Sequence, residues 1–433
     1  MLFKGISMQQ HTSRDIERTV TVTGAFKKEL PDVFVASTHH RRALRSLKDI
    51  KQDMTIKNYR NRRRKFAAQT MDQLMKGLTV PLTTILKSYK RTLSNLHPYE
   101  STVADLTLTA RVKAGQPDLN DILKQIKSLR AETSKIAKHY ASKAKIAASA
   151  TEADELLEEG MQLLEQLYSD SNDYNTFDEI LALENDNNDN DNDDMDNDND
   201  DNDNDIISID MIDNNNNNDI EKNISPANAL AELVEIQKEL RRIPVIELAT
   251  PTVVLVGAPN VGKSSIVRAV SSGTPEVNNY PFTTRGVTIG HISDENRGLR
   301  FQVMDTPGLL DRPEDERNEM ERLTFASLAH LPTAVIFVID ASGLSGERLS
   351  SVEAQLNVRN YLRSRFPRRP WLDIVSKADL KDTIDESILN SMPQDYLHIS
   401  TEDGTNVQIL QDSIEGMMNE LKIMLIEMQQ AKE

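Results

Sequence analysis

The sequence predicts two folded parts of different class, an all-α helical bundle followed by an α/β domain with a mostly parallel sheet and helices on both faces. Three observations predict them. Apolar residues recur at helical spacing from Leu119 to Leu167, short apolar runs end in loops after Thr252, and an Asn/Asp-rich tract separates the two patterns. The boundaries that we expect along the 433 residues are an N-terminal segment (1–37), a basic helical domain (38–183), a disordered Asn/Asp-rich insertion (184–224), a linker helix (225–250) and the α/β domain (251–433).

The helical domain is expected to be a bundle of about four helices. Residues 38–100 read as helical and are dense in Lys and Arg. From Asp118 onward, apolar side chains fall mostly on one helix face, which indicates a packed core and not a ligand site. These are Leu119, Ile122, Leu123, Ile126, Leu129, Ile136, Tyr140, Leu156, Leu157, Met161, Leu163, Leu164 and Leu167. Ser225 and Pro226 then form an N-cap followed by proline at the first helical position, which predicts a helix to about Arg242.

Charge is distributed unevenly along the chain, whose formal net charge is −17. Glu184 to Glu221 contains 16 Asp or Glu and no Lys or Arg, whereas residues 1–150 contain 29 Lys or Arg against 12 Asp or Glu, a net charge of +17. The run from Lys57 to Lys65 is the centre of this basic region. A solvated helix face is one interpretation of the run. The net charge of the whole region favours contact with a nucleic acid.

Composition excludes several classes of protein. The chain contains no cysteine, which rules out disulfides and thiolate metal sites and favours a reducing intracellular compartment. Its longest apolar runs, such as Thr333 to Ala341, are shorter than the ~18 residues that a membrane span needs, so we expect no membrane partner. The aspartates of the Asn/Asp-rich tract imitate a calcium loop, but the loop glycine and the terminal glutamate are missing.

The first motif of the α/β domain follows Thr252–Val256, an apolar run typical of a buried parallel strand. Gly257–Ser264 has the GxxxxGKS spacing of a phosphate-binding loop, in which backbone N–H groups and a helix N-terminus surround phosphate oxygens. Lys263 is expected to contact the outer phosphates, and Ser264 to offer its hydroxyl to Mg²⁺. The nucleotide-binding residues predicted here are Gly257, Ala258, Pro259, Asn260, Val261, Gly262, Lys263, Ser264 and Ser265.

A second motif follows the expected strand Leu299–Met304. Asp305-Thr306-Pro307-Gly308 is a DxxG element, and Leu309 comes directly after it. Asp305 is placed to hold Mg²⁺ through water, and the Gly308 amide is placed to sense a γ-phosphate.

The segment Asn279–Gly286 lies between these two motifs and is a candidate first switch. A threonine there would close on Mg²⁺ and the γ-phosphate, and Thr284 is favoured, with Thr283 close behind. The alternative is a plain turn before the expected strand Val287–Ile292.

A third motif selects the base. After expected strands at 334–339 and 371–375 comes Ser376-Lys377-Ala378-Asp379, which matches the guanine-reading [NST]KxD element. Asp379 would accept two hydrogen bonds from guanine, and adenine would leave it partly unpaired. Ser400 lies in His398–Thr401, where a small loop is expected against the base. The order and spacing of the three motifs predict a P-loop G domain that binds GTP.

Several segments closely resemble the Nog family, a branch of the Obg-type GTPases. They are Asn279–Gly286, Asp305–Leu310, His330–Val335, Leu96–Glu100 and Asp105–Leu108. The resemblance implies hydrolysis of GTP with Mg²⁺ and a role in large ribosomal subunit assembly, with ribosomal RNA contacted by the helical domain. Ser376, where nucleolar members usually have Asn, and the short chain look more like organelle-type members, so a plastid or other organelle is favoured and the nucleolus is the alternative.

The sequence leaves several candidates for the residues that assist hydrolysis. Ras-type GTPases have glutamine after the DxxG glycine, and here that position is Leu309, which cannot orient water. Asn260 resembles the asparagine with which cation-dependent GTPases hold K⁺ between the phosphates. Arg285 and an arginine supplied by the ribosome are competing sources of positive charge. The catalytic candidates are Asn260, Lys263, Thr284 and Gly308, and the rival function is a weakly hydrolysing, GTP-dependent RNA-binding scaffold on pre-ribosomes.

Overall fold

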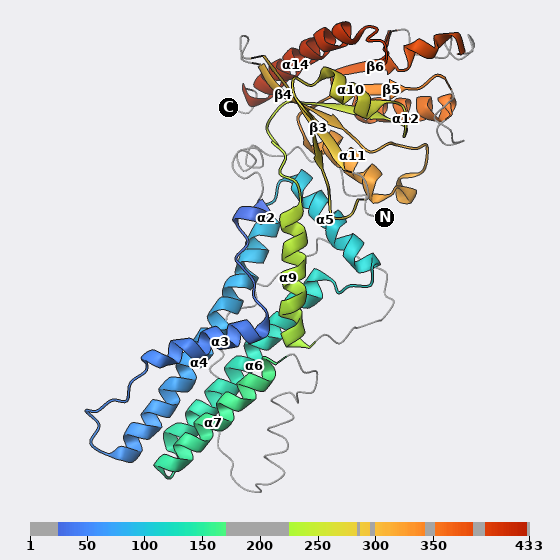
Figure 1. Cartoon of the computed structure of the whole chain (residues 1–433). Coiled ribbons are helices and arrows are strands. Elements are labelled where there is room, and N and C mark those ends of the chain that lie inside the picture. The colour runs from blue at the N-terminus through green and yellow to red at the C-terminus, as the bar shows by residue number, and fades with distance from the viewer. Residues whose placement is uncertain are drawn as a thin grey trace.

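The computed structural model describes residues 25–169, 225–283, 286–294, 299–342, 351–383 and 395–430. Figure 1 shows a long helical part with an α/β domain at one end of it, so both predicted fold classes are confirmed. The expected insertion at 184–224 lies outside the described residues. No helix within the described ranges is both long enough and apolar enough to cross a bilayer.

Local sequence explains where the helices of the helical part begin. The side chains of Asn58, Asp118 and Ser149 each cap the first turn of a helix, and Ser149 forms a reciprocal capping box with Glu152. The helices are α2 (Ala25–Lys28), α3 (Ala36–Ser46), α4 (Tyr59–Ser94), α5 (Pro98–Lys113), α6 (Leu119–Ile146), α7 (Ala150–Leu167) and α9 (Pro226–Arg242), with a short 3₁₀ helix η1 (Leu47–Asp49).

Helix α9 belongs to the core of the helical part, and its sequence-based description as a linker was therefore incomplete. Its apolar face is fully buried against α5 and α6 together with the predicted stripe of α6. The amide group of Gln237 on α9 also holds the N-terminal segment, because it accepts a hydrogen bond from Val33 N at 3.2 Å and donates one to Pro31 O. Each buried leucine stabilises such a core by about 1.5–3 kcal/mol, and the leucines and isoleucine of this face are Leu230, Leu233, Ile236 and Leu240.

The sheet of the α/β domain has seven strands in the order β2-β3-β4-β1-β5-β6-β7. Strands β4, β1, β5, β6 and β7 are parallel, and β2 and β3 add an antiparallel edge. The five strands expected with stated bounds are confirmed to within one or two residues. The bounds are β1 (Thr252–Gly257), β2 (Glu276–Asn278), β3 (Val287–Asp294), β4 (Leu299–Asp305), β5 (Thr333–Ile339), β6 (Trp371–Val375) and β7 (Tyr396–His398).

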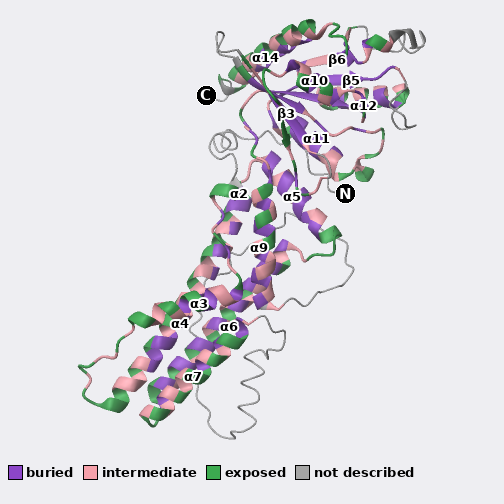
Figure 2. Ribbon diagram, viewed as in Figure 1, coloured by how far each residue is buried: buried purple, intermediate pink, exposed green. Residues whose placement is uncertain are grey.

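Helices cover both faces of this sheet, as predicted. Alternate residues of β1 point to opposite faces, so Val253 and Leu255 pack under α10 (Lys263–Val270) and α14 (Val407–Gln430), whereas Val254 and Val256 pack under α11 (Glu319–His330) and α12 (Val352–Arg365). The central strands β1 and β5 are buried along their whole length, and Figure 2 shows buried residues concentrated in the middle of the domain.

The strand order determines where a ligand can bind. Strand β1 lies between β4 and β5, so the connections leave it toward opposite sides of the sheet. In open α/β sheets such a reversal creates a crevice beyond the carboxyl ends of the strands. The three predicted motifs follow β1, β4 and β6, and they therefore meet at this edge.

Candidate nucleotide-binding site

The phosphate loop connects β1 to α10 through a tight turn. At Gly257 an added Cβ atom would lie 2.3 Å from the carbonyl oxygen of Val338, so only glycine allows β1 to approach β5 here. Gly262 caps α10 with φ 96°, and Asn260 has φ 62°, both in the left-handed region. Asparagine is one of the few residues that tolerate this conformation. The loop sequence therefore suits its backbone, independently of any ligand.

Lys263 is buried under the loop that it follows. Its Nζ atom donates to the carbonyl oxygens of Ala258 at 2.8 Å and of Gly257 at 3.2 Å. Burial lowers the pKa of Lys263 to about 8, while nearby Asp305 acts in the opposite direction. An ammonium group held this way gains from a bound phosphate, because the phosphate would favour the charged form. Lys263 therefore lies under the predicted phosphate-binding loop, and its contact with a phosphate stays a prediction.

Ser264 and Asp305 form a pair of oxygen donors beside Lys263. The Ser264 hydroxyl donates to Oδ2 of Asp305, and Oδ1 of Asp305 is buried with no hydrogen-bond partner in the structure. Burial raises the pKa of the Asp305 carboxyl, against the opposing effects of Lys263 and Ser264. Hard divalent cations bind such oxygens, and Mg²⁺ commonly takes one or two protein ligands and completes its shell with phosphates and water. The two residues therefore fit Mg²⁺ bound together with a nucleotide.

The DxxG element is attached to the phosphate loop. Thr306 Oγ1 donates to Leu255 O at 2.7 Å, and Leu309 N donates to Gly257 O at 3.0 Å. A Cβ atom on Gly308 would lie 2.5 Å from Pro259 N, so only glycine allows this contact. The Leu309 side chain is buried in the core under α11 and α12. This position after Gly308 is therefore part of the hydrophobic core and not a group that faces the site.

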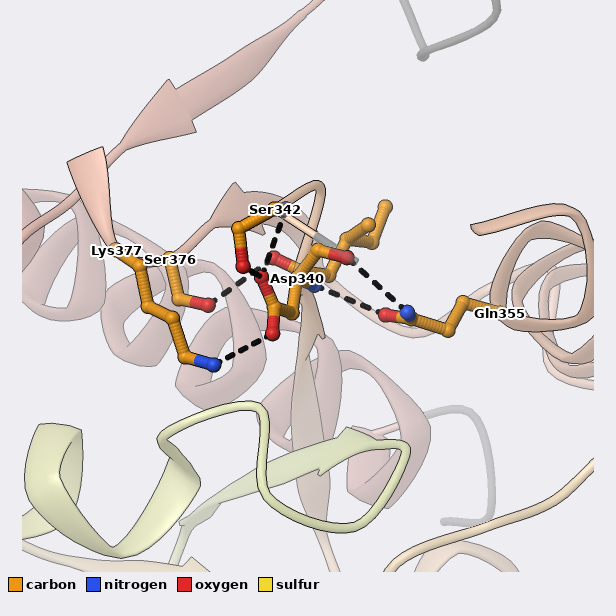
Figure 3. A network of polar contacts seen from close by, with 6 residues as sticks. Asp340, Ser342, Gln355, Ser376 and Lys377 are labelled. Atoms are coloured by element: carbon orange, nitrogen blue, oxygen red, sulfur yellow. Dashed lines mark hydrogen bonds and ion pairs between the residues drawn. The ribbon is translucent and has the colours of Figure 1, made fainter. Parts of the chain in front are cut away.

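The base-reading segment is held by a network that the sequence did not indicate (Figure 3). Asp340, fully buried after β5, accepts hydrogen bonds from Lys377 Nζ at 2.6 Å and from Ser342 N at 2.9 Å. Gln355 on α12 accepts from the Asp340 backbone N–H at 2.9 Å and donates to the Asp340 carbonyl at 3.1 Å. Ser376 Oγ donates to Ile339 O at 3.1 Å. These contacts fix the start of the Ser376–Asp379 loop.

The remaining predicted base contacts lie at the same edge. Ala378 N donates to Ile399 O at 3.0 Å, which joins the base-reading loop to the segment after β7. Ser400 is buried, and its hydroxyl accepts from Glu402 N at 3.2 Å, so the side chain shapes the turn. Asp379 is exposed, so its carboxylate is accessible to a ligand. The structure thus brings the three motifs together.

Two predicted residues cannot be placed. Thr284 and Arg285 lie outside the described residues, so the proposed Mg²⁺ contact of Thr284 stays a prediction. The described part of the first switch, up to Thr283, turns back on itself, because Thr283 N donates to Tyr280 O at 3.1 Å. The sequence did not indicate roles for Asp340, Gln355 or Tyr280. An acidic residue directly after the buried strand β5 was the one available signal, and it pointed only to Asp340.

Two family models match the chain. Residues 252–376 match a model described as a 50S ribosome-binding GTPase, and residues 26–174 match a model described as the NOG1 N-terminal helical domain. The two matches correspond to the α/β domain and to the helical part, so the chain carries a GTPase domain.

The curated relatives share the name nucleolar GTP-binding protein 1. Nucleolar GTP-binding protein 1 from Caenorhabditis elegans is 39% identical over 153 residues, which are 35% of this chain and 22% of the relative. The Arabidopsis thaliana protein of that name is 39% identical over 159 residues, 37% of this chain and 23% of the relative. These matches span about a quarter of the relatives' length.

A solved structure described as nucleolar GTP-binding protein 1 from Plasmodium falciparum is 26% identical, and the alignment covers 44% of this chain and 96% of that one with a TM-score of 0.36. The matches to both domain models and to the curated relatives show that this chain is similar to the Nog family of GTP-binding proteins in its helical part and in its GTPase domain.

Proposed function

We propose that this chain binds GTP with Mg²⁺ and hydrolyses it to GDP and phosphate. The observation that carries the proposal is the meeting of the phosphate loop, the DxxG element and the base-reading loop at one edge of the sheet. Mg²⁺ bound by Ser264 and Asp305 would neutralise phosphate charge, and Lys263 would add a positive charge that burial keeps away from bulk water.

Asp379 gives the site its preference for guanine. Its exposed carboxylate would accept two hydrogen bonds from the base, and the Asp340–Lys377 pair holds the loop that presents it. Each hydrogen bond to a charged group contributes about 1.5–3 kcal/mol. Loss of both hydrogen bonds between Asp379 and the base is therefore expected to weaken GTP binding about a hundredfold or more.

Nucleotide binding and turnover by the purified chain test this function. GTP is expected to bind far more tightly than ATP, and the Asp379→Asn variant is expected to lose GTP affinity and to bind xanthosine triphosphate instead. Equal affinity of the wild-type chain for ATP and GTP would contradict the assignment of the base-reading loop. Phosphate release by the wild-type chain no faster than by Lys263→Ala would leave a binding scaffold in place of a hydrolase.

We also propose ribosomal RNA on a pre-ribosomal large subunit as the partner of the helical part. One family model is described as ribosome-binding, and residues 1–150 have a net charge of +17. The exposed face of α6 carries a stripe of lysines at helical spacing, which suits a row of phosphates. The lysine stripe consists of Lys124, Lys127, Lys135, Lys138 and Lys145.

Two arginines of the basic run form contacts within the helical part. Arg63 forms a bidentate ion pair with Asp154 of α7, and Arg64 donates to the carbonyl oxygen of Ala147 at the end of α6. Both arginines join α4 to the α6–α7 turn. We therefore assign the proposed RNA contact to the lysine stripe and to exposed neighbours such as Lys57.

The compartment follows from the relatives. The sequence favoured an organelle, but the comparisons do not support that preference, because the curated relatives are named as nucleolar proteins. We propose the nucleolus as the site of action. A fluorescent tag on the endogenous protein tests this, and signal confined to an organelle would restore the first interpretation.

A further inference from the structure

Helix α5 lies at the junction of the helical part and the α/β domain, where it packs against α11 and α9 (Figure 1). Tyr99, in its first turn, points into the α/β domain. Its hydroxyl lies 2.8 Å from the hydroxyl of Tyr280, and both rings are 2% exposed. Burial raises the pKa of Tyr99 to about 12 and that of Tyr280 well above its ordinary value, so both phenols are neutral. The pair is a buried hydrogen bond between two domains.

Tyr280 belongs to the candidate first switch. Its ring lies 5.6 Å from that of Phe282, and it shares one apolar cluster with Tyr99 and Val103 of α5. The start of this segment is therefore packed into the core of the helical part. Thr283, the last residue described before the gap at 284–285, donates its backbone N–H to Tyr280 O, as noted above.

The same helix reaches the DxxG element through α11. On one side of α11, Thr324 Oγ1 donates to Pro307 O at 3.2 Å, and Glu321 Oε1 accepts from Leu310 N at 3.1 Å. On its other side, Arg322 lies 3.7 Å from Asp105 of α5. A second ion pair joins Lys113 at the end of α5 to Glu319, and the Ser327 hydroxyl of α11 interacts with Tyr99.

Helix α5 is itself held firmly in the helical part. Arg111 is 5% exposed and forms ion pairs with Glu239 at 2.8 Å and Glu232 at 3.1 Å, both on α9. Separation would leave the buried guanidinium charge without its two carboxylate partners, which is costly. A displacement of α5 would therefore carry α9 with it.

We propose that Tyr99 is a positioning residue that couples the first switch to the helical part. The proposal rests on the proposed function, since it concerns the response of the site to GTP. Tyr99 anchors Tyr280, and this lowers the entropic cost of arranging the switch around a γ-phosphate. GDP, which lacks that phosphate, gains nothing from the anchor. By linkage, a partner that displaces α5 changes the affinity for GTP by the same factor by which GTP changes the affinity for that partner.

The test removes one oxygen atom. In the full chain, Tyr99→Phe is expected to weaken binding of a non-hydrolysable GTP analogue about fivefold to tenfold and to leave GDP affinity within twofold. Tyr280→Phe is expected to change the affinity ratio in the same direction, and the double variant is expected to be no worse than Tyr99→Phe alone, because Tyr99→Phe already deletes the shared hydrogen bond together with the Ser327 contact.

Tyr168→Phe is the matched control, since it deletes another buried tyrosine hydroxyl, which lies 3.1 Å from Thr133 Oγ1 within the helical part. Tyr168→Phe is expected to lower the melting temperature by about as much as Tyr99→Phe does. It is expected to leave the ratio of GTP-analogue affinity to GDP affinity unchanged. Three results would overturn the proposal: equal losses of analogue and GDP affinity in Tyr99→Phe, an altered ratio in Tyr168→Phe, or additive losses in the double variant. A wild-type chain that binds neither nucleotide would contradict the proposed function and not the coupling alone.

Discussion

The nucleotide edge of the sheet and the end of the helical part near Arg63 both concentrate charge, yet their charged groups have different partners. At the sheet edge, the Lys263 ammonium donates to two backbone carbonyls, and one carboxylate oxygen of Asp305 is buried with no hydrogen-bond partner among the described residues. The guanidinium group of Arg63, by contrast, binds both carboxylate oxygens of Asp154 through Nε and Nη2.

The difference shows how a charged group that binds a ligand can be distinguished from one that stabilises the fold. Burying a charged group costs free energy unless it is paired, so a buried charge with unused hydrogen-bonding capacity suggests that a ligand completes it. A charge whose donors already meet protein acceptors is part of the architecture. By this criterion Lys263 and Asp305 belong to a site, and Arg63 belongs to the helix packing.

The largest expected effect concerns RNA. Replacing Lys127, Lys138 and Lys145 with alanine is expected to weaken binding of a large-subunit ribosomal RNA fragment about a hundredfold at low salt. The slope of log affinity against log salt is expected to fall by about 3, since each phosphate contact contributes about 0.9. Filter binding of the full chain across a salt series measures both quantities.

Arginine at the same three positions is the control for the lysine stripe, because it keeps the charge and is expected to keep the slope. Unchanged affinity and slope in the triple alanine variant would exclude α6 as the RNA-binding face. The charges of the helical part could then not be divided into RNA-binding and structural groups by their contacts.

A smaller effect is expected on stability at Arg63. The Arg63–Asp154 pair is partly buried and bidentate, with side chains 19% and 37% exposed. Arg63→Ala is expected to destabilise the chain by about 1–2 kcal/mol, and Arg63→Lys is expected to recover little of this, because an ammonium group cannot bind both carboxylate oxygens in the same way. Chemical denaturation measures the change.

Lys138→Ala is the matched surface change on α6 and is expected to remain within about 0.5 kcal/mol of wild type. RNA affinity is expected to change by less than threefold in Arg63→Ala. Stability near wild type together with a large loss of RNA affinity would place Arg63 with the ligand-binding charges and contradict the distinction between the two regions.

Much of the site could be predicted because its chemistry is local in sequence. A phosphate loop needs glycine and lysine at set spacings within eight residues, so Gly257, Lys263 and Ser264 could be assigned without a structure. The five longer strands were predictable for a similar reason, since each is a continuous apolar run. The three-residue strand β2 is mostly exposed and carries no such signal.

The rest depends on contacts between segments distant in sequence. The hydrogen bonds of Gln355 to Asp340 and of Tyr99 to Tyr280 join residues 15 and 181 positions apart, and nothing local in the sequence indicates either pair. The partner of Arg63 could not be predicted for the same reason, because Asp154 lies 91 positions away from it in the sequence. Helix α9 was assigned as a linker because its amphipathic face does not reveal which surface it covers.

The smallest expected effect concerns the cation that assists hydrolysis. It tests whether the neutral amide of Asn260 binds that cation and so belongs to the ligand site. Leu309 is buried in the core and cannot orient the attacking water, so we expect a cation from elsewhere to stabilise the charge that develops on the phosphates. Asn260 is exposed in the phosphate loop, where it could bind such a cation. We expect GTP turnover to be several-fold faster in K⁺ than in Na⁺ at equal ionic strength. Asn260→Ala is expected to lose this difference and still bind GDP.

The backbone at Asn260 makes a second substitution necessary. With φ 62°, alanine at this position costs about 1–2 kcal/mol of conformational strain, which could slow turnover without any cation being involved. Asn260→Gly relieves the strain and lacks the amide oxygen. If the amide holds K⁺, the glycine variant binds GDP like wild type and turns over GTP at the same rate in both salts. If the glycine variant keeps its preference for K⁺, Asn260 serves the turn alone, and the charge comes from Arg285 or from an arginine of a partner.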